Sequence, residues 1–274
     1  MTIAAIFLCG CIVGFLGAFL GIGGGVIIIP FLTIVLGYPI HEAIATSLAV
    51  VVANSITTSY AYLSGNMVNL RLGFVIALFS ILGSVLGGII GLNATAQALY
   101  LTIGAAQMIT AIFMLKKRNA EILSGEGGGW LSGEYYDPAE KKIIRYTPKR
   151  LTSVFGVAGA AGVLSGMVGI GGGVFLVPAM NILSRVPIKA VTTTSGLIMG
   201  FTAAGGGILY MLHGYTRTNV VAVMFLGIFI STRIAAKHFT KVNSINIYRA
   251  FVIFLLFVAV QMIYRGIMSN SATN

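Results

Sequence analysis

The sequence predicts an all-α integral membrane protein made of two homologous halves, and three observations lead to this prediction. Hydrophobic residues make up 57% of the 274 residues and charged residues only 8%, with a mean hydropathy of +0.98. Soluble domains carry roughly 25% charged residues, so most of this chain's surface must face lipid. Long apolar stretches recur along the chain, and one glycine-rich motif occurs twice.

Eight apolar stretches are predicted to be membrane helices, because most of them approach the 20 or so residues that a helix needs to cross a bilayer. They cover residues 2–22, 41–63, 70–92, 94–115, 151–170, 188–212, 218–236 and 245–264. Two shorter stretches, 26–36 and 174–184, directly follow the glycine motifs. Each would extend only about 17 Å as a helix, too short for a straight crossing, so we expect half-helices.

A polar segment, residues 116–150, divides the chain into a first transmembrane repeat (1–115) and a second one (151–274). It carries eight Lys or Arg residues and five of the six acidic residues, without His, Cys or a recognisable motif. Residues 134–138 and 141–146 could pair as a small hairpin. We therefore expect a solvated cytoplasmic linker rather than a catalytic domain.

The duplication can be counted directly. A shift of 148 residues aligns Gly14–Ser47 with Gly162–Ser195 without a gap, and 14 of the 34 positions are identical. The identities include the Gly-Ile-Gly-Gly-Gly-Val motif at 21–26 and 169–174. They also include two prolines and a Thr-Ser pair in each half, and a bias toward glycine alone would not keep these in register.

The short stretches decide whether the halves are parallel or inverted. If each one re-enters, a half has four crossings and the repeats are parallel; if each one crosses, a half has five segments and the repeats are inverted. Cytoplasmic loops are enriched in Lys and Arg. With the linker inside, inversion puts four basic residues inside and two outside: Arg185, Lys189, Lys237 and Lys241 against Arg217 and Arg265. Inversion is favoured, with both termini outside.

Three glycines inside a membrane span break the helix and leave backbone groups unpaired, which hydrocarbon tolerates only beside protein or a wet cavity. The half-helix after each triplet would direct free N–H groups and its positive dipole end to mid-membrane, an arrangement that binds anions. Close helix packing is the alternative explanation for the glycines. The predicted substrate-binding glycines are Gly23, Gly24, Gly25, Gly171, Gly172 and Gly173.

Polar side chains within the spans indicate a neutral pathway for an oxyanion. A Thr-Ser pair follows each half-helix, Thr46–Ser47 in the first half and Thr194–Ser195 in the second. Asn54 lies further along the segment that holds Thr46–Ser47. We predict that these five side chains bind substrate, although hydroxyls in membrane helices often bond their own backbone. Gln97 and Gln107 are further candidates. Four prolines are predicted to break helices or to act in gating: Pro30, Pro39, Pro178 and Pro187.

Ionisable residues within the spans are few and fall near predicted helix ends, where their side chains can reach the interface. They are His41, Glu42, Arg71, Lys189, His213 and Arg233, of which Arg233 could attract an anion from the cytoplasm. The sequence offers no catalytic group, metal-ligand set, cofactor motif or P-loop for ATP. The basic residues are scattered rather than gathered in a patch, which argues against a nucleic-acid partner.

The doubled motif resembles the TauE/SafE family of sulfite and organosulfonate exporters. The resemblance rests on Gly-x-Gly-Gly-Gly-x4-Pro followed by Pro-x6-Thr-Ser in both halves, which together are nearly the whole chain. It implies a multi-pass permease of a prokaryotic plasma membrane for small sulfur-containing anions such as sulfite, sulfoacetate or thiosulfate. Only the long linker lies outside the family pattern.

The main functional prediction is a secondary transporter, an exporter of sulfite or an organosulfonate, that works by alternating access. The alternatives are a passive anion channel, an uptake permease for an anion such as thiosulfate, an intramembrane enzyme and a partner subunit. A proton or sodium ion could drive transport, and the chain could form a homo-oligomer. The sequence does not specify the anion, the direction or the driving ion.

Overall fold

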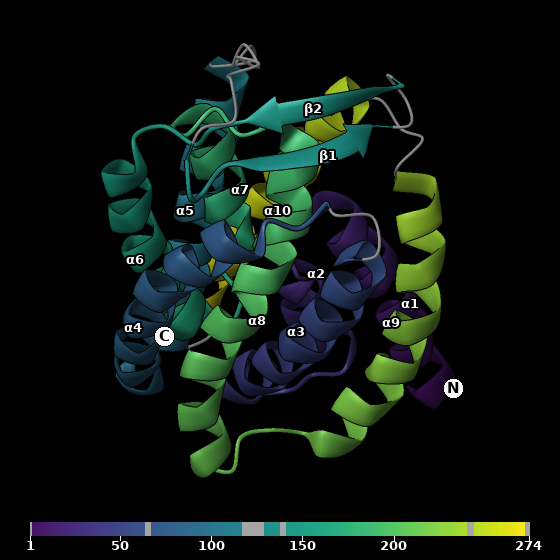
Figure 1. Cartoon of the computed structure of the whole chain (residues 1–274). Coiled ribbons are helices and arrows are strands. Elements are labelled where there is room, and N and C mark those ends of the chain that lie inside the picture. The colour runs from purple at the N-terminus through teal and green to yellow at the C-terminus, as the bar shows by residue number, and fades with distance from the viewer. Residues whose placement is uncertain (1, 64–66, 117–128, 138–140, 240–243, 272–274) are drawn as a thin grey trace.

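The computed structural model describes residues 2–63, 67–116, 129–137, 141–239 and 244–271 and consists mainly of helices (Figure 1). The first half contains α1 (Thr2–Leu20), α2 (Gly25–Pro30), the π-helix η1 (Phe31–Val35), α3 (Ile40–Leu63), α4 (Leu70–Asn93) and α5 (Ala96–Lys116). The second half contains α6 (Leu151–Val168), α7 (Gly173–Ile182), α8 (Ile188–Leu212), α9 (Thr218–Phe239) and α10 (Ser244–Ser271). The elements of the two halves correspond one to one, except for the π-helix.

Six helices in the described part of the chain are long and apolar enough to cross a membrane: α1, α3, α4, α6, α8 and α9. The chain is therefore a helical, multi-pass membrane protein. The helix ends follow local chemistry. The Asn69 side chain accepts the Leu72 N–H at 3.0 Å and caps α4, while α8 begins directly after Pro187.

Small residues bring helices of opposite halves together. Glycines of α4 pack against α6, and a methyl group added at Gly87 would overlap the backbone of Val163. The equivalent pair, α1 of the first half and α9 of the second, is packed in the same way, and a methyl group at Gly14 would overlap the backbone of Ile228. Without side chains at these positions the backbones approach closely, as is common between membrane helices.

The long helices α3 and α8 pack against each other and run in opposite directions. Glu42, in the first turn of α3, contacts Arg217, which follows the end of α8. Thr193, near the start of α8, donates its hydroxyl at 2.6 Å to the carbonyl oxygen of Met67, which follows the end of α3. These contacts lie at opposite ends of α8.

Strands β1 (Gly133–Asp137) and β2 (Lys142–Tyr146) form an antiparallel hairpin within the linker, so the predicted hairpin is present. It lies across one end of the helical bundle (Figure 1). Alternate side chains face the bundle, as strand geometry requires, and Tyr135 and Ile144 are buried while Glu134 is exposed. The linker is thus not simply solvated, because one face of its hairpin packs on the protein. Residues 117–128 lie outside the described residues.

Candidate functional site

Each glycine motif forms a turn with the same backbone conformation. Gly21, Gly23 and Gly24 have φ values of 68°, 72° and 85°, and the equivalent residues 169, 171 and 172 have φ values of 81°, 84° and 79°. Residues with a Cβ rarely adopt this left-handed region, and glycine enters it freely. The glycines are therefore needed to end one helix and start the next, with Gly24 and Gly172 as the N-caps of α2 and α7.

The two glycine turns lie against each other. A methyl group on Gly25 would lie 2.6 Å from the carbonyl oxygen of Gly169, and one on Gly173 would lie 2.5 Å from that of Gly21. Both separations are shorter than real Cβ contacts. The N-terminus of each half-helix thus lies against the first glycine of the opposite turn, and a side chain at Gly25 or Gly173 would overlap that backbone.

Two serines connect the turns across the halves. The Ser47 hydroxyl donates to the carbonyl oxygen of Gly169 at 2.8 Å, and the Ser195 hydroxyl donates to that of Gly21 at 2.9 Å. Each contact maps onto the other by the shift of 148 residues. A reciprocal exchange of this kind is expected across a two-fold axis. The structure therefore places the predicted serines at the glycine turns, where they bind the backbone of the opposite half.

The neighbouring threonines do not reach the glycine turns in the same way. The Thr46 hydroxyl accepts the backbone N–H of Arg217 at 3.1 Å, and the Thr194 hydroxyl accepts that of Asn69 at 3.0 Å. This pair of bonds also obeys the shift of 148. Each threonine thus secures the connection between two long helices of the opposite half.

Asn54 lies at the first glycine turn, where its amide donates to the carbonyl oxygen of Gly23 at 3.0 Å. The equivalent Thr202 instead donates to the Ser80 hydroxyl at 2.8 Å. Ser165 takes part in the second turn, because its Cβ would lie 3.5 Å from a methyl group on Gly172. The Ser165 hydroxyl is buried and has no hydrogen-bond partner within the described residues. The repeat could not indicate Ser165, because its equivalent in the first half is Gly17.

Each half-helix begins with N–H groups that cannot be paired within the helix. The N–H groups of Ile27 and Ile28 both donate back to the Gly24 carbonyl, and those of Phe175 and Leu176 donate to Gly172. Within the described residues, no turn or loop carbonyl accepts the N–H groups that precede these in each first turn. Both helix dipoles direct their positive ends to the place where the turns meet, which favours an anion there.

The four prolines lie at two kinds of position. Pro39 and Pro187 stand just before α3 and α8, and they begin these helices. Pro178 lies inside a regular α7, whereas Pro30 ends α2 and is followed by the π-helix η1. Both prolines lack a backbone donor, yet only Pro30 is followed by a π-helix, so the missing donor alone does not cause the change.

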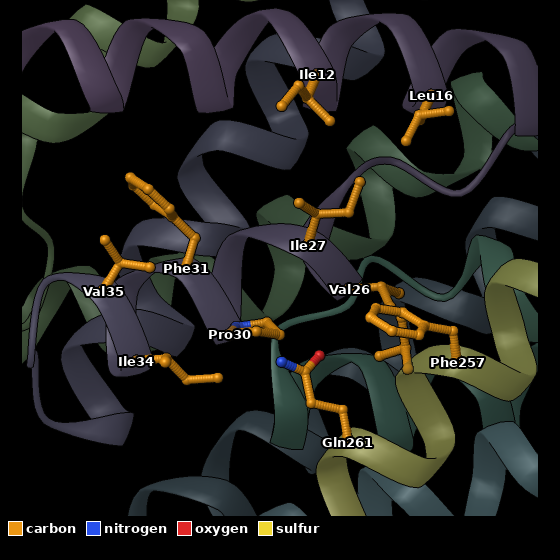
Figure 2. Close-up of a pocket in the computed structure, with 11 residues that line it drawn as sticks. Ile12, Leu16, Val26, Ile27, Pro30, Phe31, Ile34, Val35, Phe257 and Gln261 are labelled. Carbon is orange, nitrogen blue, oxygen red and sulfur yellow. The ribbon is translucent and has the colours of Figure 1, made fainter.

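An apolar pocket of about 320 Å³ lies beside α2 in the first half. Figure 2 shows Ile12 and Leu16 of α1 on one side, and Gln261 of α10 with its amide pointing toward Pro30. Gln261 begins a Gln-Met-Ile sequence that recurs at Gln107 in α5. Gln107 is fully buried, and both amide atoms lack a hydrogen-bond partner within the described residues. The pocket therefore opens beside α2 at Gln261 of the second half, whereas Gln107 of the first half is enclosed.

Ion pairs lie at both ends of the bundle. The Arg217 guanidinium binds both carboxylate oxygens of Glu42, at 2.7 and 2.8 Å, and this contact raises the pKa of Arg217. At the hairpin end, the Lys189 ammonium lies 2.8 Å from a carboxylate oxygen of Asp137. The expectation that Lys189 reaches the membrane interface is wrong, because its side chain is only 1% exposed and pairs with the linker.

Of the other predicted ionisable residues, His41 is half-buried, and three are exposed: Arg71, His213 and Arg233. Arg233 lies over the Phe229 ring, with its guanidinium carbon 4.4 Å from the ring centre. The described residues contain no group of three or more His, Cys, Asp or Glu residues that could hold a metal ion.

The family model described as sulfite exporter TauE/SafE matches residues 6–262. The chain belongs to this family. A probable membrane transporter protein of Bacillus subtilis, YunE, is 26% identical over 98% of this chain and all of its own length. A second from that organism, YdhB, is 28% identical over 86% of this chain and 89% of its own length. A third, from Methanocaldococcus jannaschii, is 28% identical over 85% of each chain.

No solved structure matches the chain significantly. The resemblance to the TauE/SafE family that the doubled motif indicated is confirmed, and the chain is a membrane transporter of this family. Its relatives are named as transporters rather than enzymes.

Proposed function

We propose that this TauE/SafE chain is a secondary transporter that exports sulfite or an organosulfonate across a prokaryotic plasma membrane. The anion binds where the N-termini of α2 and α7 meet, near mid-membrane. The meeting of the two glycine turns, connected by Ser47 and Ser195, is the observation that carries this proposal. Two helix N-termini directed at one point attract a small anion and offer it backbone N–H groups.

The proposed site is neutral apart from the helix dipoles. Ser47 and Ser195 donate their single O–H groups to the Gly169 and Gly21 carbonyl oxygens, so the donors left for a small oxyanion are the Ser165 hydroxyl and the second N–H of the Asn54 amide. A site without a fixed cation binds an anion weakly enough to release it, which transport requires. The buried Ser165 hydroxyl, which has no hydrogen-bond partner in the described part of the chain, is one donor that the anion would satisfy.

The two halves are proposed to be inverted repeats. The equivalent helices α3 and α8 run in opposite directions, which is expected when the two-fold axis lies in the membrane plane. The excess of basic residues on the linker side supports the same arrangement. Inverted repeats let the halves exchange conformations, so that one site faces each side of the membrane in turn.

A difference between the halves favours alternating access over a continuous channel. A pocket opens beside α2 and Gln261, whereas the corresponding Gln107 is enclosed. Two equivalent regions in different conformations are expected when a transporter rests in one of its two states. A passive anion channel remains the second candidate, and an uptake permease for an anion such as thiosulfate the third.

Flux through liposomes that contain only this protein tests the proposal. Radiolabelled sulfite should cross at a rate that saturates with concentration, and unlabelled sulfoacetate or thiosulfate should compete if the site accepts them. Imposed proton and sodium gradients would identify a coupling ion. Ion current without saturation would instead establish the channel, and liposomes impermeable to all three anions would contradict the proposed function.

A further inference from the structure

Lys189 and Asp137 form an ion pair that is completely enclosed. Lys189 is the second residue of α8 and Asp137 the last residue of β1, and their side chains are 1% and 0% exposed. Removing two charges from water costs free energy that their attraction barely repays, so a buried pair is a weak source of stability. A pair of this kind therefore calls for a role other than holding the hairpin in place.

Lys189 begins a row of polar groups that leads to the glycine turns. Thr192 and Ser195 follow it at intervals of three residues, which places the three side chains on one face of α8. The Thr192 hydroxyl is fully buried and has no hydrogen-bond partner within the described residues. The Ser195 hydroxyl donates to the Gly21 carbonyl at the glycine turn. An ammonium group thus stands two helical turns from the proposed anion site, with an unused hydroxyl between them.

The first half has a basic side chain at the equivalent position. His41 precedes Ser47 by six residues, as Lys189 precedes Ser195, and it lies at the opposite end of the bundle. The Nε2 atom of His41 is buried without a hydrogen-bond partner in the described part of the chain. Each half therefore places a basic residue six positions before its serine, although the first half has Ile44 where the second has Thr192. The hairpin adds the Asp137 carboxylate beside Lys189, at one end of the bundle.

The linker supplies the Asp137 carboxylate that lies beside Lys189. The chain contains six acidic residues, and Glu42 is the only one outside the linker. The hairpin is anchored to both halves: the Asn69 amide donates to the Leu131 carbonyl at 3.0 Å, and the Lys149 N–H donates to the Ser184 carbonyl at 3.1 Å. The docked hairpin thus covers this end of the bundle and fills the hydrogen-bonding position of the ammonium with a negatively charged oxygen.

We propose that the Lys189 ammonium binds the transported anion on the linker side, and that Asp137 is a tethered competitor for it. This inference rests on the proposed function and extends it by a residue and a regulatory contact. The Asp137 carboxylate and a small sulfur oxyanion have the same chemistry toward an ammonium group, since each offers negatively charged oxygens that accept its N–H bonds.

Exchange of one anion for the other keeps Lys189 paired throughout. The hairpin that carries Asp137 also covers Lys189, so an incoming anion reaches the ammonium as the hairpin leaves and replaces the carboxylate as its partner. A tethered group acts at a high effective concentration, of order millimolar for short flexible connections. The contact therefore sets a concentration threshold, below which the linker side stays closed.

Three variants separate competition from a structural role when sulfite flux is measured in liposomes. Asp137→Asn should lower the KM for sulfite about tenfold, because a charge-assisted hydrogen bond no longer opposes the anion. Lys189→Gln should raise the KM, and the double variant should behave like Lys189→Gln alone. Glu134→Gln is the matched control, since it breaks the exposed hairpin pair with Arg145 and should leave the KM unchanged.

A purely structural pair would give a different pattern. Both single variants would then lose flux through loss of folded protein, and the double variant would recover it at the wild-type KM. That result, or an unchanged KM in Asp137→Asn, would overturn the inference while wild-type flux upheld the proposed function. An inactive wild type would instead contradict the proposed function itself.

Hydrogen exchange on the wild-type protein gives a readout that needs neither a variant nor transport. Sulfite should increase exchange at the backbone amides of residues 133–137 and 142–146, compared with chloride at equal ionic strength, because the anion releases the hairpin. Equal exchange in the two salts, at sulfite concentrations that saturate flux, would overturn the competitor role of Asp137.

Discussion

The Ser195 hydroxyl lies 2.9 Å from the carbonyl oxygen of Gly21, 174 residues away in the chain. Its counterpart, Ser47, makes the same bond to Gly169 at 2.8 Å. Each half therefore holds the glycine turn of the other. The two half-helix N-termini are positioned by the interface between the halves, so any movement of one half against the other must change the site.

Replacing either serine by alanine should loosen both turns to a similar degree. Ser47→Ala and Ser195→Ala each leave a buried carbonyl without its donor, which costs about 1–3 kcal/mol. We expect a lower thermal unfolding temperature and weaker sulfite transport in both variants. Thr57→Ala is the control, because the Thr57 hydroxyl bonds only the backbone of its own helix. A lower unfolding temperature or weaker sulfite transport in only one of the two serine variants would contradict the reciprocal arrangement.

Alanine at the two N-cap glycines should have unequal effects. Both positions have positive φ, which costs a residue with a Cβ roughly 1–2 kcal/mol. At Gly24 the added methyl group would also overlap the Val13 side chain, whereas at Gly172 it would make only ordinary contacts. Gly24→Ala should therefore destabilise the protein more than Gly172→Ala.

Gly37→Ala isolates the backbone contribution to that comparison. Gly37 has a φ of 69°, and nothing lies within 4 Å of its added methyl group. Thermal unfolding of the three variants in one detergent measures the difference. A loss of stability in Gly37→Ala as large as that in Gly24→Ala would show that strain alone, rather than contact with α1, decides the effect.

Gln107→Leu should stabilise the resting conformation and slow transport. The amide of Gln107 is buried without a hydrogen bond in the described part of the chain, and leucine removes this unfavourable polar group at similar size. If the cycle requires this region to open as the one beside Gln261 does, the unfolding temperature should rise while turnover falls. Gln261→Leu, at the open pocket, is the comparison. A faster Gln107→Leu transporter would contradict the proposed exchange of states.

The proposed inversion predicts that the linker and the C-terminus lie on opposite sides of the membrane. A reporter that is active only outside the cytoplasm should be active when it is fused after Asn274. A reporter that is active only in the cytoplasm should be active when it is inserted at residues 117–128. Reporters on the same side at both positions would establish parallel repeats.

Much of the fold could be predicted because its signals are local. Apolar stretches predicted helix ends within about three residues except at the end of α10, which continues to Ser271 rather than 264; α3, predicted at 41–63, spans Ile40–Leu63. The glycine triplets marked both turns, since positive φ is a property of single residues. The shift of 148 also identified Ser47 and Ser195 as a matched pair.

The contacts that complete the site are not local, which is why the sequence did not reveal them. Lys189 finds its carboxylate 52 residues away in the linker, so its position near a predicted helix end suggested only the interface. Ser165 has a glycine as its equivalent. Gln107 and Gln261 share a Gln-Met-Ile sequence at a shift of 154 rather than 148, so the counted repeat did not pair them.

Equilibrium binding of radiolabelled sulfite to the purified protein tests the central claim most directly, in wild type, Gly25→Ala and the control Gly37→Ala. A methyl group on Gly25 would meet the backbone of Gly169 and Ile170 and separate the two turns. The account predicts saturable binding to wild type and Gly37→Ala, and at least tenfold weaker binding to folded Gly25→Ala, about 1.4 kcal/mol. Equal affinity in all three would contradict an anion site between the paired half-helices.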